Sequence, residues 1–242
     1  MAEKITFYSH RQGPNPWKSV TVFEELEVPY QTIYLEFGKV PNGVEDEGFL
    51  NKNPAGRVPL IYDPATGNTS NSPRSQKVDR RRTGVPLTES NTIALYLVDQ
   101  YDKDAKLTFR TTPEKYLVSQ WLYLQGATQA PMFQQALLFA LGKNNPEAQA
   151  HLRGIVKRTL ATIDTALDGK TYLVGDKCTI ADLAFVNWDL TLDVRLKGDP
   201  EAALREQRKA LYPNRWAWHH RILERPAVKK MIQTQKEANP SS

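Results

Sequence analysis

The chain has 242 residues, and its balance of 40% hydrophobic and 24% charged residues is typical of a folded globular protein, not of a disordered one. The net charge of +5 comes without a long basic tail, because the densest basic cluster lies within the single stretch 74–82, so we expect no nucleic-acid partner. No apolar run approaches the roughly 20 residues of a membrane helix, and no signal-peptide pattern opens the chain. We therefore expect a cytoplasmic protein without a membrane partner.

The cysteine and histidine content excludes two further classes of site. Cys178 is the only cysteine, which rules out an internal disulfide and a paired-cysteine metal site. The four histidines lack the spacing of zinc ligands, so we expect no metal cofactor.

Alternating polar and apolar residues predict two strands near the N-terminus, at residues 4–8 and 30–37. Between them, Asn15 followed by Pro16 is typical of a helix start with Asn15 as the N-cap. This helix is expected to end before Pro29.

A turn-rich segment, Asn53-Pro54-Ala55-Gly56, leads into a third strand at residues 58–62, which has a proline at its second position. Proline has no N–H to give a strand ladder, so the position suits a sheet edge, a bulge or a cis turn. The polar and basic loop 64–84 is too long for an ordinary connection and is expected to be mobile or functional. A fourth strand at 85–87 and a helix from Glu89 complete an order typical of a thioredoxin-like domain.

The rest of the chain has helical periodicity and no convincing strand. A long helix opens at Pro113 and is expected to kink at Pro131, and a second long helix runs over residues 146–167. Thr179 and Asp182 form an S/T-x-x-D capping box at the start of another helix. Shorter helices are expected at residues 201–209, 213–223 and 226–235.

Several of these motifs make the chain resemble the glutathione S-transferase family. Arg57-Val58-Pro59 resembles the cis-proline loop of the family and Glu89-Ser90 its glutamyl-binding pair, and the resemblance extends to residues 174–182. Residues 9–18 read Ser-His-Arg-x-x-Pro-Asn-x-x-Lys. This run is similar to the fungal and bacterial nitrogen-regulator-like (Ure2p-like) branch, which has Asn in place of the Tyr or Ser hydroxyl.

The resemblance implies an α/β plus all-α architecture. Residues 1–104 are then a thioredoxin-like glutathione-binding domain that includes the basic loop 64–84, and residues 105–242 are an all-helical domain that contributes the electrophile pocket. It also implies glutathione as co-substrate, a hydrophobic electrophilic small molecule as the second substrate, and a homodimer.

The resemblance assigns the thiol chemistry to Asn15. Only the thiolate attacks electrophiles, and a free thiol with a pKa of ~8.5 is mostly protonated at neutral pH. A helix N-terminus and the amide of Asn15 both favour the anion, although by spacing alone Asn15 reads as a plain helix cap.

The hydroxyls that other members of the family use are absent here. Their positions fall on Phe7 and near Gly13 and Pro14, and strand alternation turns Tyr8 to the face opposite Phe7. Ser9, at the end of the first strand, is the second catalytic candidate, with an ordinary turn serine as the alternative.

The resemblance places the glutamyl end of glutathione at Glu89 and Ser90. Glu89 takes the α-ammonium, and the Ser90 hydroxyl with the first N–H groups of its helix receives the α-carboxylate. The alternative is ordinary helix-start chemistry. Val58, before Pro59, offers its N–H and C=O to the cysteinyl unit, or is a plain strand residue.

The glycyl carboxylate is assigned to Arg57 and Lys39. Here the chain departs from the pattern of the family, because the histidine of some members falls at about Val44.

The electrophile pocket is assigned to Met132, Gln135 and Phe139, which follow Pro131, although Met and Phe at helical spacing are also typical of a core. The predicted function is a glutathione transferase, with detoxification as its setting. Two alternatives stay open. One is a glutathione-dependent cis-trans isomerase of a conjugated polyene in fungal secondary metabolism, and the other is a non-catalytic binding or regulatory protein on the same fold.

Overall fold

The computed structural model describes residues 4–66, 84, 86–142, 145–195 and 204–239. The chain forms two compact units, Met1–Tyr101 together with Lys230–Ser242, and Asp102–Lys229. The return of the last residues to the first unit was not predicted from the sequence. Most of the predicted basic loop, residues 67–83, lies outside the described residues, and its described start is a short 3₁₀ turn, Pro64–Thr66.

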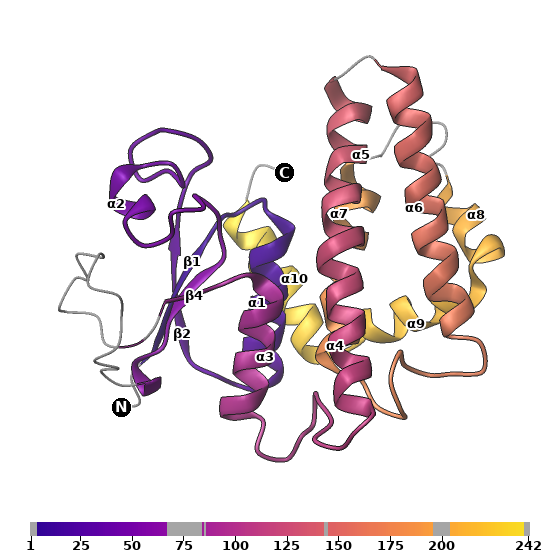
Figure 1. Ribbon diagram of the computed structural model, residues 1–242, viewed down its shortest axis with the longest axis horizontal. Helices are drawn as coiled ribbons and strands as arrows, with labels where there is room; N and C mark the ends of the chain where they lie inside the picture. The colour runs from indigo at the N-terminus through magenta and orange to yellow at the C-terminus, as the bar shows by residue number, and fades with distance from the viewer. Residues whose placement is uncertain (1–3, 67–83, 85, 143–144, 196–203, 240–242) are drawn as a thin grey trace. The chain divides into compact units, whose positions relative to one another are not determined.

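The first unit contains a four-stranded sheet in the order β2-β1-β3-β4 (Figure 1). Strand β1 (Ile5–Ser9) is parallel to β2 (Tyr30–Tyr34), while β3 (Leu60–Tyr62) is antiparallel to β1 and to β4 (Pro86–Thr88). All four predicted strands are present, which confirms the thioredoxin-like fold of this unit. The third begins two residues later than predicted, after Pro59, because proline has no N–H for the ladder.

Helices cover both faces of this sheet. Helices α1 (Pro14–Glu25) and α3 (Ser90–Tyr101) lie on one face, and the short α2 (Glu47–Leu50) lies on the other (Figure 1). The prediction of Asn15 as N-cap is wrong, since Gly13 is the N-cap and Asn15 lies in the first turn. Two prolines flank Asn15, and Pro14 already has the fixed φ that suits the first helical position.

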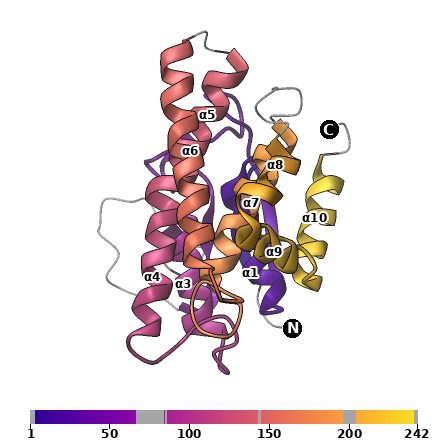
Figure 2. The ribbon, with the colours of Figure 1, turned by 90° about the vertical axis from the view of Figure 1, so that its right-hand side faces the viewer.

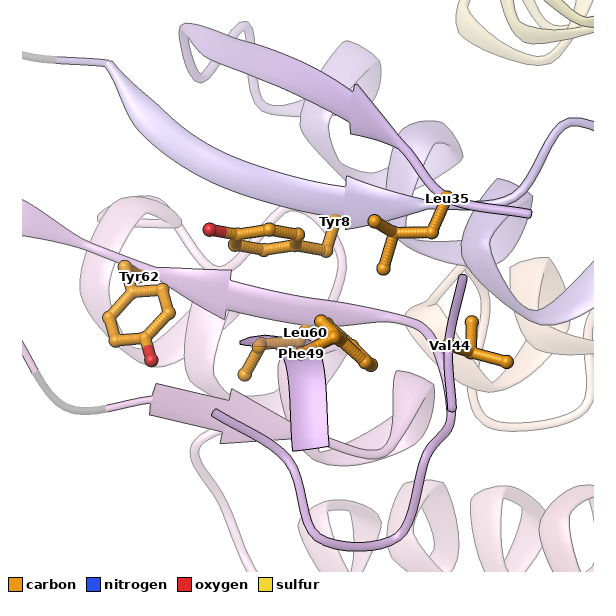
Figure 3. Packing of buried hydrophobic residues seen from close by; sticks show 6 residues of the cluster. All are labelled: Tyr8, Leu35, Val44, Phe49, Leu60 and Tyr62. Atoms are coloured by element: carbon orange, nitrogen blue, oxygen red, sulfur yellow. The ribbon is translucent and has the colours of Figure 1, made fainter. Parts of the chain in front are cut away.

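Strand alternation separates Phe7 and Tyr8, as the sequence predicted. The Phe7 ring packs edge-on against Phe23 of α1, with ring centroids 5.4 Å apart. Tyr8 belongs to the cluster on the α2 side, which Figure 3 shows with its other members Leu35, Val44, Phe49, Leu60 and Tyr62. The Tyr8 side chain is therefore a core residue of the first unit.

The residue after β3 ties this strand to α3. Asp63 is 1% exposed, and its carboxylate accepts hydrogen bonds from the hydroxyls of Tyr96 at 2.6 Å and Tyr101 at 2.5 Å. Gly84 approaches so closely that a Cβ there would lie 2.2 Å from the carbonyl oxygen of Asp63. A side chain at this position would displace the end of β3.

The second unit contains only helices among its described residues. Helices α4 (Glu114–Leu124) and α5 (Ala130–Gly142) run on through a π-helical segment, Gln125–Gln129 (Figure 1). Pro131 explains this segment, because it has no N–H and its ring excludes the carbonyl four residues earlier. The irregularity predicted at Pro131 thus lies in the turn before it.

Helices α6 and α7 pack against this long rod, and α9 packs against α6 and α7. Figure 2 shows α6 beside α5, and α6 begins at an Asn145 side chain that accepts from the N–H of Ala148 at 3.0 Å. The full set after α5 is α6 (Pro146–Ala166), α7 (Ile180–Arg195), α8 (Leu204–Leu211), α9 (Pro213–Leu223) and α10 (Pro226–Ala238).

The capping box at the start of α7 is confirmed and extends further than predicted. The Asp182 carboxylate accepts from the N–H of Thr179 at 2.8 Å, and the Thr179 hydroxyl accepts from the N–H of Ala181. Asp182 also accepts from the N–H of Leu173 at 2.9 Å and from the indole N–H of Trp218 at 2.8 Å. One buried carboxylate thus joins α7, the preceding loop and α9.

We expect Asp182→Ala to lower the free energy of unfolding by about 3 to 5 kcal/mol, because several buried donors lose their acceptor at about 1 to 3 kcal/mol each. Urea denaturation measures the change. Asp176→Ala, at an exposed position nearby, is the matched control. A loss below about 1 kcal/mol in Asp182→Ala would contradict the joining role of this carboxylate.

Candidate active site

The strand register of the first unit brings separate motifs to one edge of the sheet. Tyr8 pairs with Leu60, and Leu60 pairs with Thr88, so the end of β1, the start of β3 and the end of β4 lie side by side. The predicted site residues adjoin these three positions: Ser9 ends β1, Val58 and Pro59 precede β3, and Glu89 and Ser90 follow β4.

The loop before β3 is shaped by Asn53. The Val58-Pro59 peptide bond is cis, one of the geometries that the sequence suggested. Asn53 is 5% exposed, and its side-chain amide donates to the carbonyl of Arg57 at 2.6 Å and accepts from the N–H of Ala55 at 3.2 Å. The buried side-chain amide of Asn53 therefore holds this loop, and the loop presents the backbone of Val58 at this edge of the sheet.

Glu89 and Ser90 form a sharp junction between β4 and α3. Glu89 has a φ of 63°, in the left-handed region that non-glycine residues seldom adopt, while its carbonyl accepts from the N–H of Ile93. Its side chain is exposed, and the Ser90 side chain is buried at the first turn of α3. An acceptor for an ammonium and the donors of a helix N-terminus thus occur in two consecutive residues.

Asn15 has an unusual share of the donors at the start of α1. A helix leaves its first N–H groups without helical partners, but here residues one and three of the helix are Pro14 and Pro16, which have none. Asn15 carries the only backbone N–H among the first three residues, in addition to its side-chain amide. Its side chain is half-buried.

Lys18 is a residue to which the sequence analysis gave no role. It lies one turn after Asn15 on the same side of α1, is 4% exposed, and donates to the Asn91 side-chain oxygen of α3 at 3.2 Å. Burial lowers the pKa of the Lys18 ammonium to about 7, against a smaller opposing effect of the Glu89 carboxylate. In the sequence, the spacing of three residues between Asn15 and Lys18 was the signal that could have placed Lys18 next to Asn15.

The positions assigned to the glycyl carboxylate lie in loops. Arg57 precedes the cis-proline bond, Lys39 follows β2, and both are exposed. Val44, where some members of the family have histidine, is 5% exposed and belongs to the apolar cluster around Tyr8. Val44 is therefore a core residue of the first unit.

The predicted electrophile residues share one side of α5 in the second unit. Met132 and Phe139 are half-buried and Gln135 is exposed, at helical spacings of three and four. The neighbouring Phe133 and Leu137 instead enter the core of this unit. The assigned residues therefore lie on the side of α5 that the core leaves partly open.

Family comparisons agree with this fold. The N-terminal domain of glutathione S-transferases matches residues 3–99, and the C-terminal domain matches residues 128–226. Glutathione S-transferase 2 of Schizosaccharomyces pombe is 34% identical over 93% of each chain, and the glutathione S-transferase-like protein OpS6 of Beauveria bassiana is 35% identical over 96% of each. The chain belongs to the glutathione S-transferase family.

A solved structure specifies the branch. The glutathione transferase URE2P6 of Phanerochaete chrysosporium, in complex with oxidized glutathione, is 32% identical with a TM-score of 0.82, over 98% of this chain and 99% of that one. This likeness supports the Ure2p-like branch and glutathione as the small molecule of the site.

The described residues contain no group of three or more His, Cys, Asp or Glu side chains that could hold a metal ion. In the same parts of the chain, no helix combines the length and apolarity needed to span a membrane.

We expect the stability contributed by Lys18 to rise with pH. The unfolded ammonium has a pKa near 10.5, so above about pH 7 the unfolded chain holds a proton that native Lys18 has released. The unfolding free energy of the wild type should therefore increase relative to Lys18→Met between about pH 7 and 10, by at most about 1.4 kcal/mol per pH unit. Denaturant titrations across this range measure it.

Lys115→Met, at an exposed lysine of α4, is the control for general pH effects. A difference between wild type and Lys18→Met that does not change with pH would contradict the lowered pKa.

Proposed function

We propose that the protein is a glutathione transferase that binds glutathione at the sheet edge of its first domain, ionises the thiol beside Asn15 and transfers the sulfur to a hydrophobic electrophile. The observation that carries this proposal is the register of β1, β3 and β4, which gathers Ser9, Val58 and Ser90 at one edge. Glutathione binding is assigned to residues 1–104 and the electrophile pocket to residues 105–242. The proposed setting is the cytoplasm.

In this proposal the glutamyl group binds at the junction of β4 and α3. The Glu89 carboxylate receives the α-ammonium, and Ser90 with the first N–H groups of α3 receives the α-carboxylate. Val58, before the cis bond to Pro59, pairs its backbone with the cysteinyl unit. This pairing places the thiol between the ends of β1 and β3, near the start of α1.

The thiol is activated mainly by Asn15. Because Pro14 and Pro16 remove two of the donors that a helix N-terminus normally offers, the Asn15 amide carries a large share of the stabilisation of the anion. Ser9 at the end of β1 is the second candidate donor, although its side chain is 1% exposed and its hydroxyl lies 3.5 Å from the carbonyl oxygen of His10. The thiol proton passes to solvent and the sulfur lone pair attacks the electrophilic carbon, forming a C–S bond while the leaving group departs with its bonding pair or, at a conjugated alkene, while the neighbouring carbon takes a proton from water.

The other end of glutathione and the second substrate complete the proposal. Arg57 and Lys39 attract the glycyl carboxylate, and both are exposed as such a contact requires. Met132, Gln135 and Phe139 offer the partly open side of α5 to the electrophile.

We further infer a homodimer. Tyr116 and Tyr123 lie two turns apart on α4, with 62% and 76% of their surface exposed. Large aromatic side chains gathered on one exposed face are typical of a protein interface. This face is the part of the second unit that we assign to the partner subunit.

We expect Ser90→Ala to weaken glutathione binding by about 1 to 3 kcal/mol, the range for a lost hydrogen bond to a charged group. Isothermal calorimetry measures the dissociation constant. Thr92→Ala removes an exposed hydroxyl from the same helix and should leave the affinity unchanged. Equal affinities in Ser90→Ala and wild type, with the fold intact, would sink the assignment of the glutamyl site.

We expect Asn15→Ala to raise the pKa of bound glutathione thiol by about one to two units, since a hydrogen bond to a charge contributes about 1.5 to 3 kcal/mol and each unit corresponds to about 1.36 kcal/mol. An ultraviolet pH titration of the thiolate measures it. Transfer to an electrophile at neutral pH, followed by mass spectrometry of the product, should slow accordingly.

Tyr8→Phe is the matched control, because its ring lies in the core cluster. The thiolate titration of this variant should follow the wild type. The reverse pattern, a shift in Tyr8→Phe and none in Asn15→Ala, would transfer the role to the tyrosine.

A further inference from the structure

Phe37 is an aromatic side chain left in the open next to the candidate site. It is 59% exposed, although a phenylalanine gains ~1.5 to 3 kcal/mol when fully buried. It follows β2 closely, and β2 runs beside the end of β1, where the N–H of Leu35 donates to the carbonyl of Ser9 at 2.9 Å. The exposed ring therefore belongs to the same edge of the sheet as Ser9.

One face of the Phe37 ring is already covered. His10 stacks on it, with ring centroids 3.5 Å apart and an interplanar angle of 22°. His10 itself is 5% exposed, and its Nδ1 accepts from the N–H of Gln12 at 3.0 Å. Burial lowers the pKa of the His10 imidazole, which favours the neutral form of the backing ring. With one face against His10, the open surface of Phe37 is its other face and its edge.

The segment that carries His10 is held from several sides. The carbonyl of Arg11 accepts from the indole N–H of Trp17 at 2.8 Å and from the Asn239 amide at 3.0 Å. The Arg11 guanidinium lies 3.0 Å from the Glu36 carboxylate, next to Phe37. These contacts connect both sides of the stacked pair, so the platform is preorganised and does not have to form when a ligand arrives.

The ring also reaches the start of α1. A Cβ added to Gly13 would lie 3.8 Å from Phe37 Cζ, an ordinary contact distance, so the ring lies close to the backbone at the start of the helix. Gly13 is the N-cap of α1, two residues before Asn15. An apolar plane thus adjoins the place where the proposed function puts the sulfur.

We propose that the open face of Phe37, backed by His10, is an electrophile subsite of the first domain that selects planar aromatic or conjugated electrophiles. This inference rests on the proposed function and adds the class of second substrate to it. The thiolate sulfur donates its electron pair to the ring or alkene carbon. The leaving group departs with its own pair, or a proton from water adds to the neighbouring carbon of the alkene.

The test compares two glutathione derivatives by calorimetry, so that turnover is not needed. S-(2,4-dinitrophenyl)glutathione carries a planar aromatic group and S-methylglutathione does not. The wild type should bind the aromatic derivative more tightly, and Phe37→Leu, which keeps an apolar side chain without a ring face, should reduce that preference roughly three- to tenfold. Its affinity for S-methylglutathione should equal that of the wild type.

Two further variants sharpen the result. Phe37→Tyr keeps the ring and should keep the preference, and Leu211→Ala, which removes an exposed apolar side chain from α8, should do the same. An unchanged preference in Phe37→Leu overturns the proposal, as does an equal loss for both derivatives, which would place Phe37 against glutathione itself. Failure of the wild type to bind either derivative would overturn the proposed function as well.

Discussion

The pairing of β3 between β1 and β4 is the constraint on which the first unit depends. This strand has only three residues, yet its first pairs with both Tyr8 and Thr88 and so aligns three chain segments at one edge. At its other end, Asp63 receives two tyrosine hydroxyls from α3. The same short strand therefore sets the position of the cis-proline loop and anchors the helix that starts at Ser90.

The electrostatics of the edge follow from its helix starts. α3 offers the hydroxyl and N–H groups of a regular first turn beside an acidic residue, which suits a ligand group carrying both an ammonium and a carboxylate. At the start of α1, Pro14 and Pro16 lack N–H groups. The side-chain amide of Asn15 and the buried amine of Lys18 lie one turn apart on this helix. In the proposed function, recognition of charge is assigned to α3 and activation of the thiol to α1, and the hydrogen bond from Lys18 to Asn91 joins these two helices.

The sequence predicted the features that depend on local periodicity and missed those that depend on distant partners. Alternation placed Phe7 and Tyr8 correctly, and the capping box at Thr179 was legible because its partners are three residues apart. The predicted start of α1 was wrong because Pro14 and Pro16, which flank Asn15, both suit the first position of a helix. Lys18 was missed because its partner Asn91 lies 73 residues away in the chain.

The π-helical turn and the exposed ring show the same limit. Pro131 indicated an irregular helix, but the π-helical turn lies before the proline, because the proline ring clashes with the carbonyl four residues earlier. Phe37 was counted in a strand that ends three residues earlier, because the chain bends at Glu36 to bridge to Gly43. Its exposure follows from that bend, which no apolar pattern encodes.

The last helix gives the first unit a property that its sequence position conceals. Lys230 of α10 lies 2.5 Å from the carboxylate of Glu24 in the last turn of α1, and Asn239, which follows α10, donates to the carbonyl of Arg11 in the loop that precedes α1. The thioredoxin-like unit is therefore discontinuous. During synthesis its sheet residues emerge first, but this loop receives the hydrogen bond from Asn239 only after that residue has been translated, so a fragment cut after Tyr101 lacks a contact that supports the candidate site.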